Sequence, residues 1–193
     1  MPGETGPGTG AAGQGSEGAG AIMRGYATRL IDLTEKHADR IALQWLGDVR
    51  MNPKTPSYHT FSDEKALSHA AAFYRSFRTL FCTEKPFDAA RKFFTKYADE
   101  RYAEGIPLHE AIYALILMRR HIWLFAEFQT LFVSAVEHRQ AAESLTRTIL
   151  LFDYATYVIT ERYEELMKRE MEERIRRDGG PGGQRQAAGA RPK

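Results

Sequence analysis

The sequence lacks several features that would mark an enzyme or a secreted protein. It has a single cysteine, Cys82, which excludes an intrachain disulfide and is typical of a reducing compartment, so we expect a cytoplasmic protein. Although the chain has 16 glycines, only Gly47 and Gly105 lie between Tyr26 and Asp178. That interior is too poor in glycine for a phosphate-binding loop, and it has neither a Gly-x-Ser-x-Gly sequence nor grouped Ser, His and Asp residues. We therefore expect no enzymatic activity.

Long apolar runs and an excess of one charge are also missing. The unbroken apolar run over residues 111–118 is far shorter than the ~20 residues that cross a bilayer. No basic-then-apolar signal segment opens the chain, so we expect no membrane association. The net charge of +2 comes from 27 basic and 25 acidic residues that are mixed along the sequence. This argues against nucleic acid as a partner, and the Cys, His and Glu spacings of zinc and di-iron sites are absent.

The two ends differ in composition from the middle. Residues 1–20 are almost entirely Gly, Ala, Pro, Thr, Ser, Gln and Glu, and residues 178–193 add Arg and Lys to a similar mixture. Segments of this kind cannot bury enough apolar surface to offset the entropy lost on ordering. We predict disordered ends at 1–20 and 178–193 around one domain, residues 21–177.

Apolar residues in this domain recur with the period of an α-helix, and no segment alternates with a period of two. The fold class is therefore all-α, with about five long helices at 21–50, 62–81, 86–105, 107–134 and 137–177. Breaks fall at Asn52-Pro53, Thr55-Pro56 and Gly105-Ile-Pro107. Inward faces are predicted for the second helix at Leu67, Ala70, Tyr74, Phe77 and Phe81, and for the third at Phe87, Ala90, Phe94 and Tyr97.

The fourth helix is apolar on nearly every face, which predicts that the other helices enclose it. Arg119 and Arg120 follow its apolar run, so at least one should lie near the packed interior. It would either extend its charge to water, pair with Glu100, Glu110 or Asp153, or line a pocket for a small anion. The candidate pocket residues are Arg101, Tyr113, Arg119, Arg120 and Trp123.

Two histidines on the same helix raise a different possibility. His121 lies beside Trp123, and His109 lies in the first turn. A buried histidine in an all-helical domain of this size is compatible with a globin-type haem pocket, but a hydrogen-bonded core histidine explains the pattern as well.

The last helix carries a heptad seam that the other helices lack. Its members alternate steps of four and three, as in a coiled coil: Leu145, Ile149, Phe152, Thr156, Ile159, Tyr163 and Leu166. Beyond Leu166 the sequence KREMEERIRR is charged, with Glu and Arg spaced for pairing. The helix is either the final one of the fold with a solvated end, or it leaves the fold to pair with a second copy or another protein.

The order of these elements resembles the N-terminal sensor domain of the RsbT co-antagonist (RsbR-type) proteins over roughly residues 22–165. The motif is an Arg before a Gly, then a Leu and Glu opening the next helix, then Leu-x-Arg, here at Arg101, Gly105, Leu108, Glu110, Leu117 and Arg119. The resemblance implies a globin-like fold without haem, which dimerises and transmits a signal along its last helix to an output domain. Because only a short Gly-rich segment follows the last helix here, we expect a domain that acts without an output domain of its own.

These observations lead to two hypotheses for the function. The first is a non-enzymatic sensory or adaptor domain that forms a homodimer, binds another signalling protein, or does both, with no cofactor. The second is a globin-like protein that binds haem or another small ligand through His121 or His109.

Overall fold

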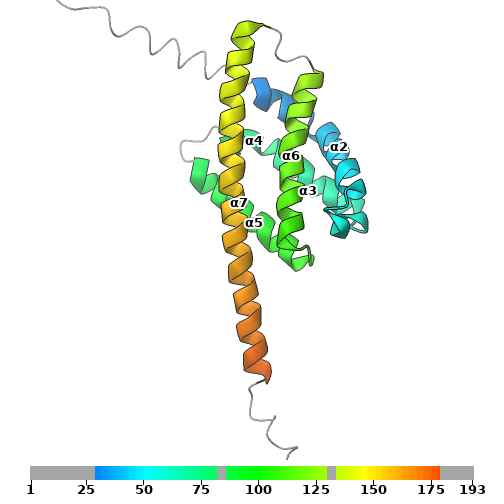
Figure 1. The fold of residues 1–193 in the computed structure, drawn as a ribbon, viewed down its shortest axis with the longest axis vertical. Helices are drawn as coiled ribbons and strands as arrows, with labels where there is room; N and C mark the ends of the chain where they lie inside the picture. Colours follow the sequence, from blue (N-terminus) through cyan, green and yellow to red (C-terminus); the bar gives the residue numbers. More distant parts are fainter. Residues whose placement is uncertain (1–28, 82–85, 130–133, 179–193) are drawn as a thin grey trace, which may run out of the picture.

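The computed structural model describes residues 29–81, 86–129 and 134–178 (Figure 1). These residues form helices and contain no strand, which confirms the all-α class. Within the same ranges no helix is both long and apolar enough to cross a membrane. The predicted end segments lie outside the described residues, except for Asp178, which is the last residue of the final helix.

The first predicted helix is divided in two. Residues 29–36 are helical, the backbone turns at His37 (φ −113°, ψ 22°), and α2 (Ala38–Met51) follows. Residues 21–28 of the prediction lie outside the described residues. Helix α2 ends just before Asn52-Pro53, where the sequence predicted a break. A short 3-10 helix, η1 (Pro56–His59), follows.

The second predicted helix is also divided. It consists of α3 (Asp63–Arg75) and α4 (Phe77–Phe81), which meet at Ser76. The Ser76 amide donates to the carbonyls of Ala72 and Phe73, at 3.0 and 3.1 Å, and thereby closes α3. Neither glycine nor proline marks this break. Ser62 is the residue before α3, as predicted, although its side chain makes no capping hydrogen bond.

The turn between α5 (Pro86–Ala103) and α6 (Leu108–Phe128) confirms the predicted break. Gly105 has a φ of +72°, a backbone conformation that favours glycine. Its amide donates to the Tyr102 carbonyl, and the Ile106 amide donates to the Arg101 carbonyl, so the free carbonyls at the end of α5 are satisfied. One predicted inward residue of α5 is wrong, because Phe87 is 61% exposed.

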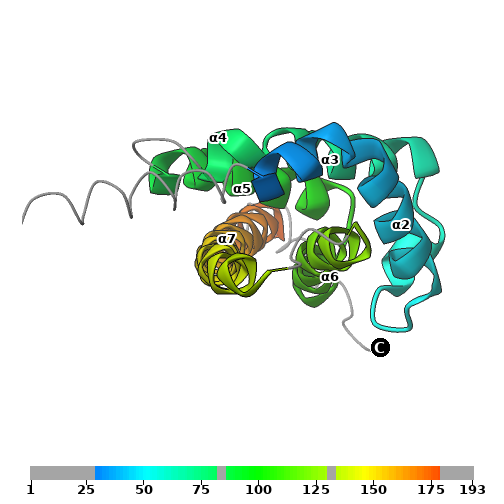
Figure 2. The same ribbon diagram turned by 90° about the horizontal axis from the view of Figure 1, so that it is seen from above.

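The last helix, α7 (Ala135–Asp178), has 44 residues and runs antiparallel beside α6 (Figure 1). Figure 2 shows α2, α3, α4 and α5 in an arc along one side of the α6–α7 pair. On the opposite side none of the described helices covers the pair, so the prediction that other helices enclose α6 is wrong for Ile116 and Leu124, which are exposed. The C-terminal end of α7 projects past all the other helices.

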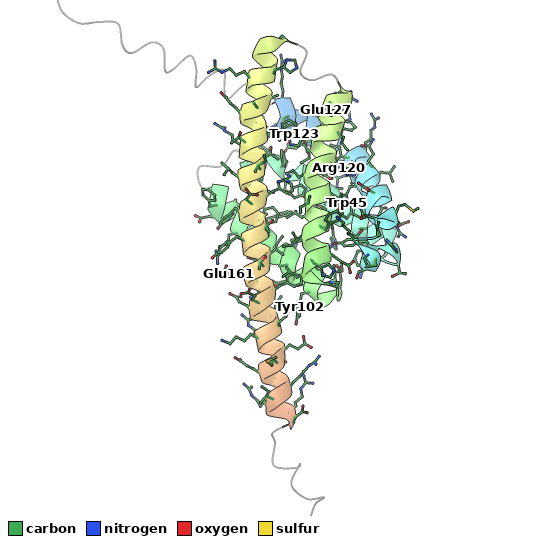
Figure 3. All side chains as sticks on the ribbon, viewed as in Figure 1. Trp45, Tyr102, Arg120, Trp123, Glu127 and Glu161 are labelled. Atoms are coloured by element: carbon green, nitrogen blue, oxygen red, sulfur yellow. The ribbon has the colours of Figure 1, made fainter. Side chains whose placement is uncertain are left out.

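Aromatic side chains fill the centre of the fold. Phe73 on α3 contacts the rings of Phe77, Phe94 and Phe152, with centroids 6.1, 6.3 and 5.6 Å apart. Trp45 on α2 donates from its indole Nε1 to the carbonyl of Ala114 at 2.9 Å, which connects α2 to α6 (Figure 3). Each such side chain contributes ~1.5–3 kcal/mol by leaving water.

Candidate functional site

A fully buried arginine lies at the end of α5. The side chain of Arg101 is 0% exposed, and its Nε lies 2.9 Å from Oε2 of Glu104. Nη2 donates to Nδ1 of His69 on α3, while the guanidinium faces the rings of Phe61 and Tyr97. Nη1 is buried and has no hydrogen-bond partner among the described residues, and the contact between Nε and Glu104 is an ion pair without hydrogen-bond geometry. Burial of an arginine is costly unless it is paired, so this cluster fixes the relative positions of α3, α5 and the residues just before α3.

Three buried tyrosines surround this guanidinium. Tyr97 donates from Oη to the Ala111 carbonyl, and Tyr163 on α7 donates to the Ile106 carbonyl, both at 3.0 Å. Burial raises the pKa of Tyr58, Tyr97 and Tyr163, although the charge of Arg101 acts in the opposite direction. The phenols therefore stay neutral. As donors, Tyr163 holds α7 to the turn after α5, and Tyr97 holds α5 to α6.

The two titratable neighbours of Arg101 have opposite shifts. Burial, and next the charge of Arg101, lower the pKa of His69, which agrees with a neutral imidazole that accepts at Nδ1. Burial raises the pKa of Glu104 more than Arg101 lowers it. The imidazole of His69 and the carboxylate of Glu104 can each bind and release a proton. The cluster contains no Ser, Thr or Cys side chain that could act as a nucleophile.

The structure separates the five predicted pocket residues. Arg101 belongs to the buried cluster, whereas Tyr113 lies under the ammonium group of Lys54, with Nζ 5.1 Å from the ring centroid. Arg119 is half-buried with its guanidinium 5.8 Å from the Phe152 ring centroid, and Arg120 is exposed. Trp123 is half-buried one turn further along α6 (Figure 3). The grooves described below are lined by other residues.

Two of the three carboxylates proposed as partners for Arg119 and Arg120 have other contacts. Glu110 accepts from the Ser57 amide at Oε2, at 2.7 Å, and from the Ser57 hydroxyl at Oε1, at 3.0 Å. Glu100 lies 3.9 Å from Nη2 of Arg101. Asp153 is exposed on α7. Sequence reasoning placed the buried cation on α6, but the fully buried one is on α5, at the motif arginine before Gly105.

The two predicted haem ligands lie apart on α6. His121 is buried, and its Nε2 lies 3.1 Å from Oδ2 of Asp48 on α2. Burial lowers the pKa of His121 more than the Asp48 carboxylate raises it. His109 is exposed in the first turn, and the twelve intervening steps correspond to ~18 Å along the helix. They cannot face one ligand from opposite sides.

The predicted seam on α7 divides into two parts. Phe152, Ile159 and Tyr163 are buried under helices of the same chain, and Leu166 is half-buried. Leu145 and Ile149, in contrast, are partly open to solvent. The middle of the seam therefore packs against helices of its own chain and is not exposed to a partner.

Sequence reasoning missed an apolar face further along α7. We call residues 164–178 the overhang, because every one of them is exposed except the half-buried Leu166 and Glu170. Met167, Met171 and Ile175 follow one another at intervals of four, so they lie on one side of the helix. The spacing is visible in the sequence, but the charged residues between these three side chains dominate the composition of the segment.

Two adjoining grooves flank the base of the overhang. The larger, of about 430 Å³, lies between the turn after α5 and α7 and is lined by Tyr102, Gly105, Ile106, Pro107, Leu108, Tyr163, Met167 and Glu170. The smaller, of about 230 Å³, continues past Tyr102 to Met171 and Arg174. Tyr102 donates from Oη to Glu170 at 2.5 Å and so ties the overhang to α5 (Figure 3).

Within the described ranges, no group of three or more His, Cys, Asp or Glu side chains is arranged to hold a metal ion. Comparison of the chain with protein-family models, with curated proteins and with solved structures gives no significant match.

Proposed function

We propose that this protein is a non-enzymatic sensory or adaptor domain that acts by binding protein, and that its overhang pairs with that of a second copy. The observation that carries the proposal is the unpartnered apolar face of the overhang. Met171 and Ile175 are each 65% exposed on a helix that has left its own fold. An extended helix with one apolar face is typical of a segment that packs against another helix.

The charges of the overhang favour a second copy as the partner. Its acidic and basic residues nearly balance, with Glu164, Glu165, Glu170, Glu172, Glu173 and Asp178 against Lys168, Arg169, Arg174, Arg176 and Arg177. A self-complementary surface of this kind suits a symmetric pair, because each copy supplies both signs. Three apolar side chains per copy are a small contact, so we expect association that depends strongly on concentration.

The resemblance to RsbR-type sensor domains supports the same function, since it implies a dimer that signals through its last helix. The cytoplasm remains our proposed location, because a single cysteine suits a reducing compartment. Haem binding is the weaker alternative. Ligation of iron through Nε2 of His121 would break its contact with Asp48 and leave that carboxylate without its imidazole partner.

Sedimentation equilibrium across a range of protein concentrations tests the proposal. We expect the wild-type protein to self-associate and Met171→Glu, which places a charge in the apolar face, to weaken the association at least tenfold. Leu43→Glu is the matched control, because Leu43 on α2 is 62% exposed and distant in sequence from the overhang. A wild-type protein that stays monomeric, or an equal effect of both substitutions, would contradict the proposal.

A further inference from the structure

A third groove, which is largely apolar, lies where α4, α5 and α7 meet, in the half of α7 that precedes the overhang. It has a volume of about 240 Å³ and is lined by Leu80, Phe81, Phe87, Arg147, Leu150 and Leu151. Leu80 and Phe81 come from the end of α4, Phe87 from the start of α5, and the others from α7. Five of the six side chains are apolar.

The wall of this groove exposes apolar surface on two helices. Phe87 and Leu150 are both more than half exposed, while Leu80 and Leu151 beneath them are buried. The Phe87 ring is held by an edge contact with Tyr154, at 5.0 Å between centroids. Single exposed apolar residues are ordinary, but two that flank a hollow with a buried floor form a site where an alkyl chain loses contact with water.

One cation lies at the rim of the same groove. Arg147, Leu150 and Leu151 occupy positions i, i+3 and i+4 of α7, so they share one face of the helix. Arg147 is exposed, and among the described residues no carboxylate lies within ion-pair distance of it. This contrasts with Arg78 on α4, which is paired with both Asp32 and Glu35. The groove therefore combines an apolar floor with an available positive charge.

We propose that this groove binds a medium-chain carboxylate, with the alkyl chain along Leu80, Phe81 and Leu151 and the carboxylate on Arg147. Its volume of about 240 Å³ is many times the ~10–15 Å³ needed for a single bound water molecule, so the groove has room for an alkyl chain of medium length. The guanidinium has the planar donor geometry that a carboxylate accepts. This site is independent of the proposed pairing through the overhang.

Titration of the full chain with octanoate, followed by amide chemical shifts, tests the site. We expect saturable shifts at residues 80–81, 87 and 147–151. Arg147→Gln should weaken octanoate binding about fivefold, the upper range for a solvent-exposed ion pair, and should leave the binding of octan-1-ol unchanged. Arg139→Gln is the matched control, because Arg139 is an exposed arginine on the same helix outside the groove.

A second variant tests the apolar part of the site. Leu150→Asn, at an exposed position, should weaken the binding of octanoate and of octan-1-ol alike, because it removes apolar surface from the wall of the groove without adding a charge. Shifts that rise without saturation, or that spread over the whole protein, would overturn the proposal. An equal effect of Arg147→Gln on octanoate and octan-1-ol would overturn the role of Arg147. Self-association through the overhang should not change in either variant.

Discussion

Both parts of α7 carry apolar residues at helical spacing, but the overhang is far richer in charged residues and the two parts have opposite surroundings. From Ser144 to Tyr163 the helix buries side chains at intervals of three and four against α4, α5 and α6. In the overhang, Met167, Met171 and Ile175 keep a comparable spacing, yet they remain exposed. The helix itself is continuous across the boundary.

The difference shows that the apolar pattern of a helix specifies a contact face and leaves open which molecule supplies the contact. The packed part of α7 has aromatic partners within its own chain, such as Phe73 for Phe152. The overhang extends beyond the other helices, so its apolar face has only the two grooves at its base. Stability should therefore depend on the first part and association on the second.

The largest expected effect is on the free energy of unfolding, and it distinguishes the stabilising part of α7 from the overhang. Phe152→Ala removes a side chain that is 2% exposed and should lower the free energy of unfolding by ~3–5 kcal/mol. Ile175→Ala, at an exposed position, should change it by less than about 0.5 kcal/mol. Urea denaturation at a protein concentration that favours the monomer measures both. Equal losses would mean that the overhang is packed against its own chain.

A smaller loss of stability is expected when a buried arginine is replaced, and none when an exposed one is. Both arginines pair with a glutamate. Arg101→Met leaves Glu104 without its partner and should cost about 3 kcal/mol, the lower range for a broken buried pair, because Glu104 is partly exposed. Arg174→Met breaks an exposed pair with Glu170 in the overhang and should leave the unfolding midpoint unchanged. Denaturation midpoints compare the two, and a neutral Arg101→Met would show that the buried cluster is not structural.

The smallest expected effect is a pH dependence confined to the packed part. Burial lowers the pKa of His69 and His121 below that of an unfolded histidine, ~6.5. As the pH falls through this value, the unfolded chain takes up protons that the folded chain does not, so stability decreases. Glu104, whose pKa is raised, has the opposite effect at lower pH. His121→Gln should therefore reduce the loss of stability between pH 7.5 and pH 5.5, as measured by thermal unfolding. An unchanged slope would contradict the assignment.

Breaks marked by backbone chemistry could be predicted from the sequence, and breaks set by packing could not. Gly105 and Pro107 fixed the turn between α5 and α6, and the prolines after Met51 fixed the end of α2. Ser76 and His37 interrupt helices without any such residue. Their local sequences are compatible with a continuous helix, so only the packing of the whole chain divides them.

The functional residues, too, could be predicted from the sequence only where the pattern is local. The sequence indicated that an arginine would be buried, but the choice among Arg101, Arg119 and Arg120 depends on which helix faces His69 and Glu104. The groove at Arg147 combines residues from three helices, and no single segment contains its pattern. The apolar face at Met167, Met171 and Ile175 was local and could have been found by its spacing alone.

The continuity of α7 has a mechanical consequence. No proline or glycine occurs between Ala135 and Asp178, so the residues that usually kink a helix are absent. From Leu150 to Met171 the helix rises ~32 Å as a single stiff rod. A small tilt of this rod where it packs against α4, α5 and α6 would displace the overhang by a larger amount, because displacement grows in proportion to distance from the pivot.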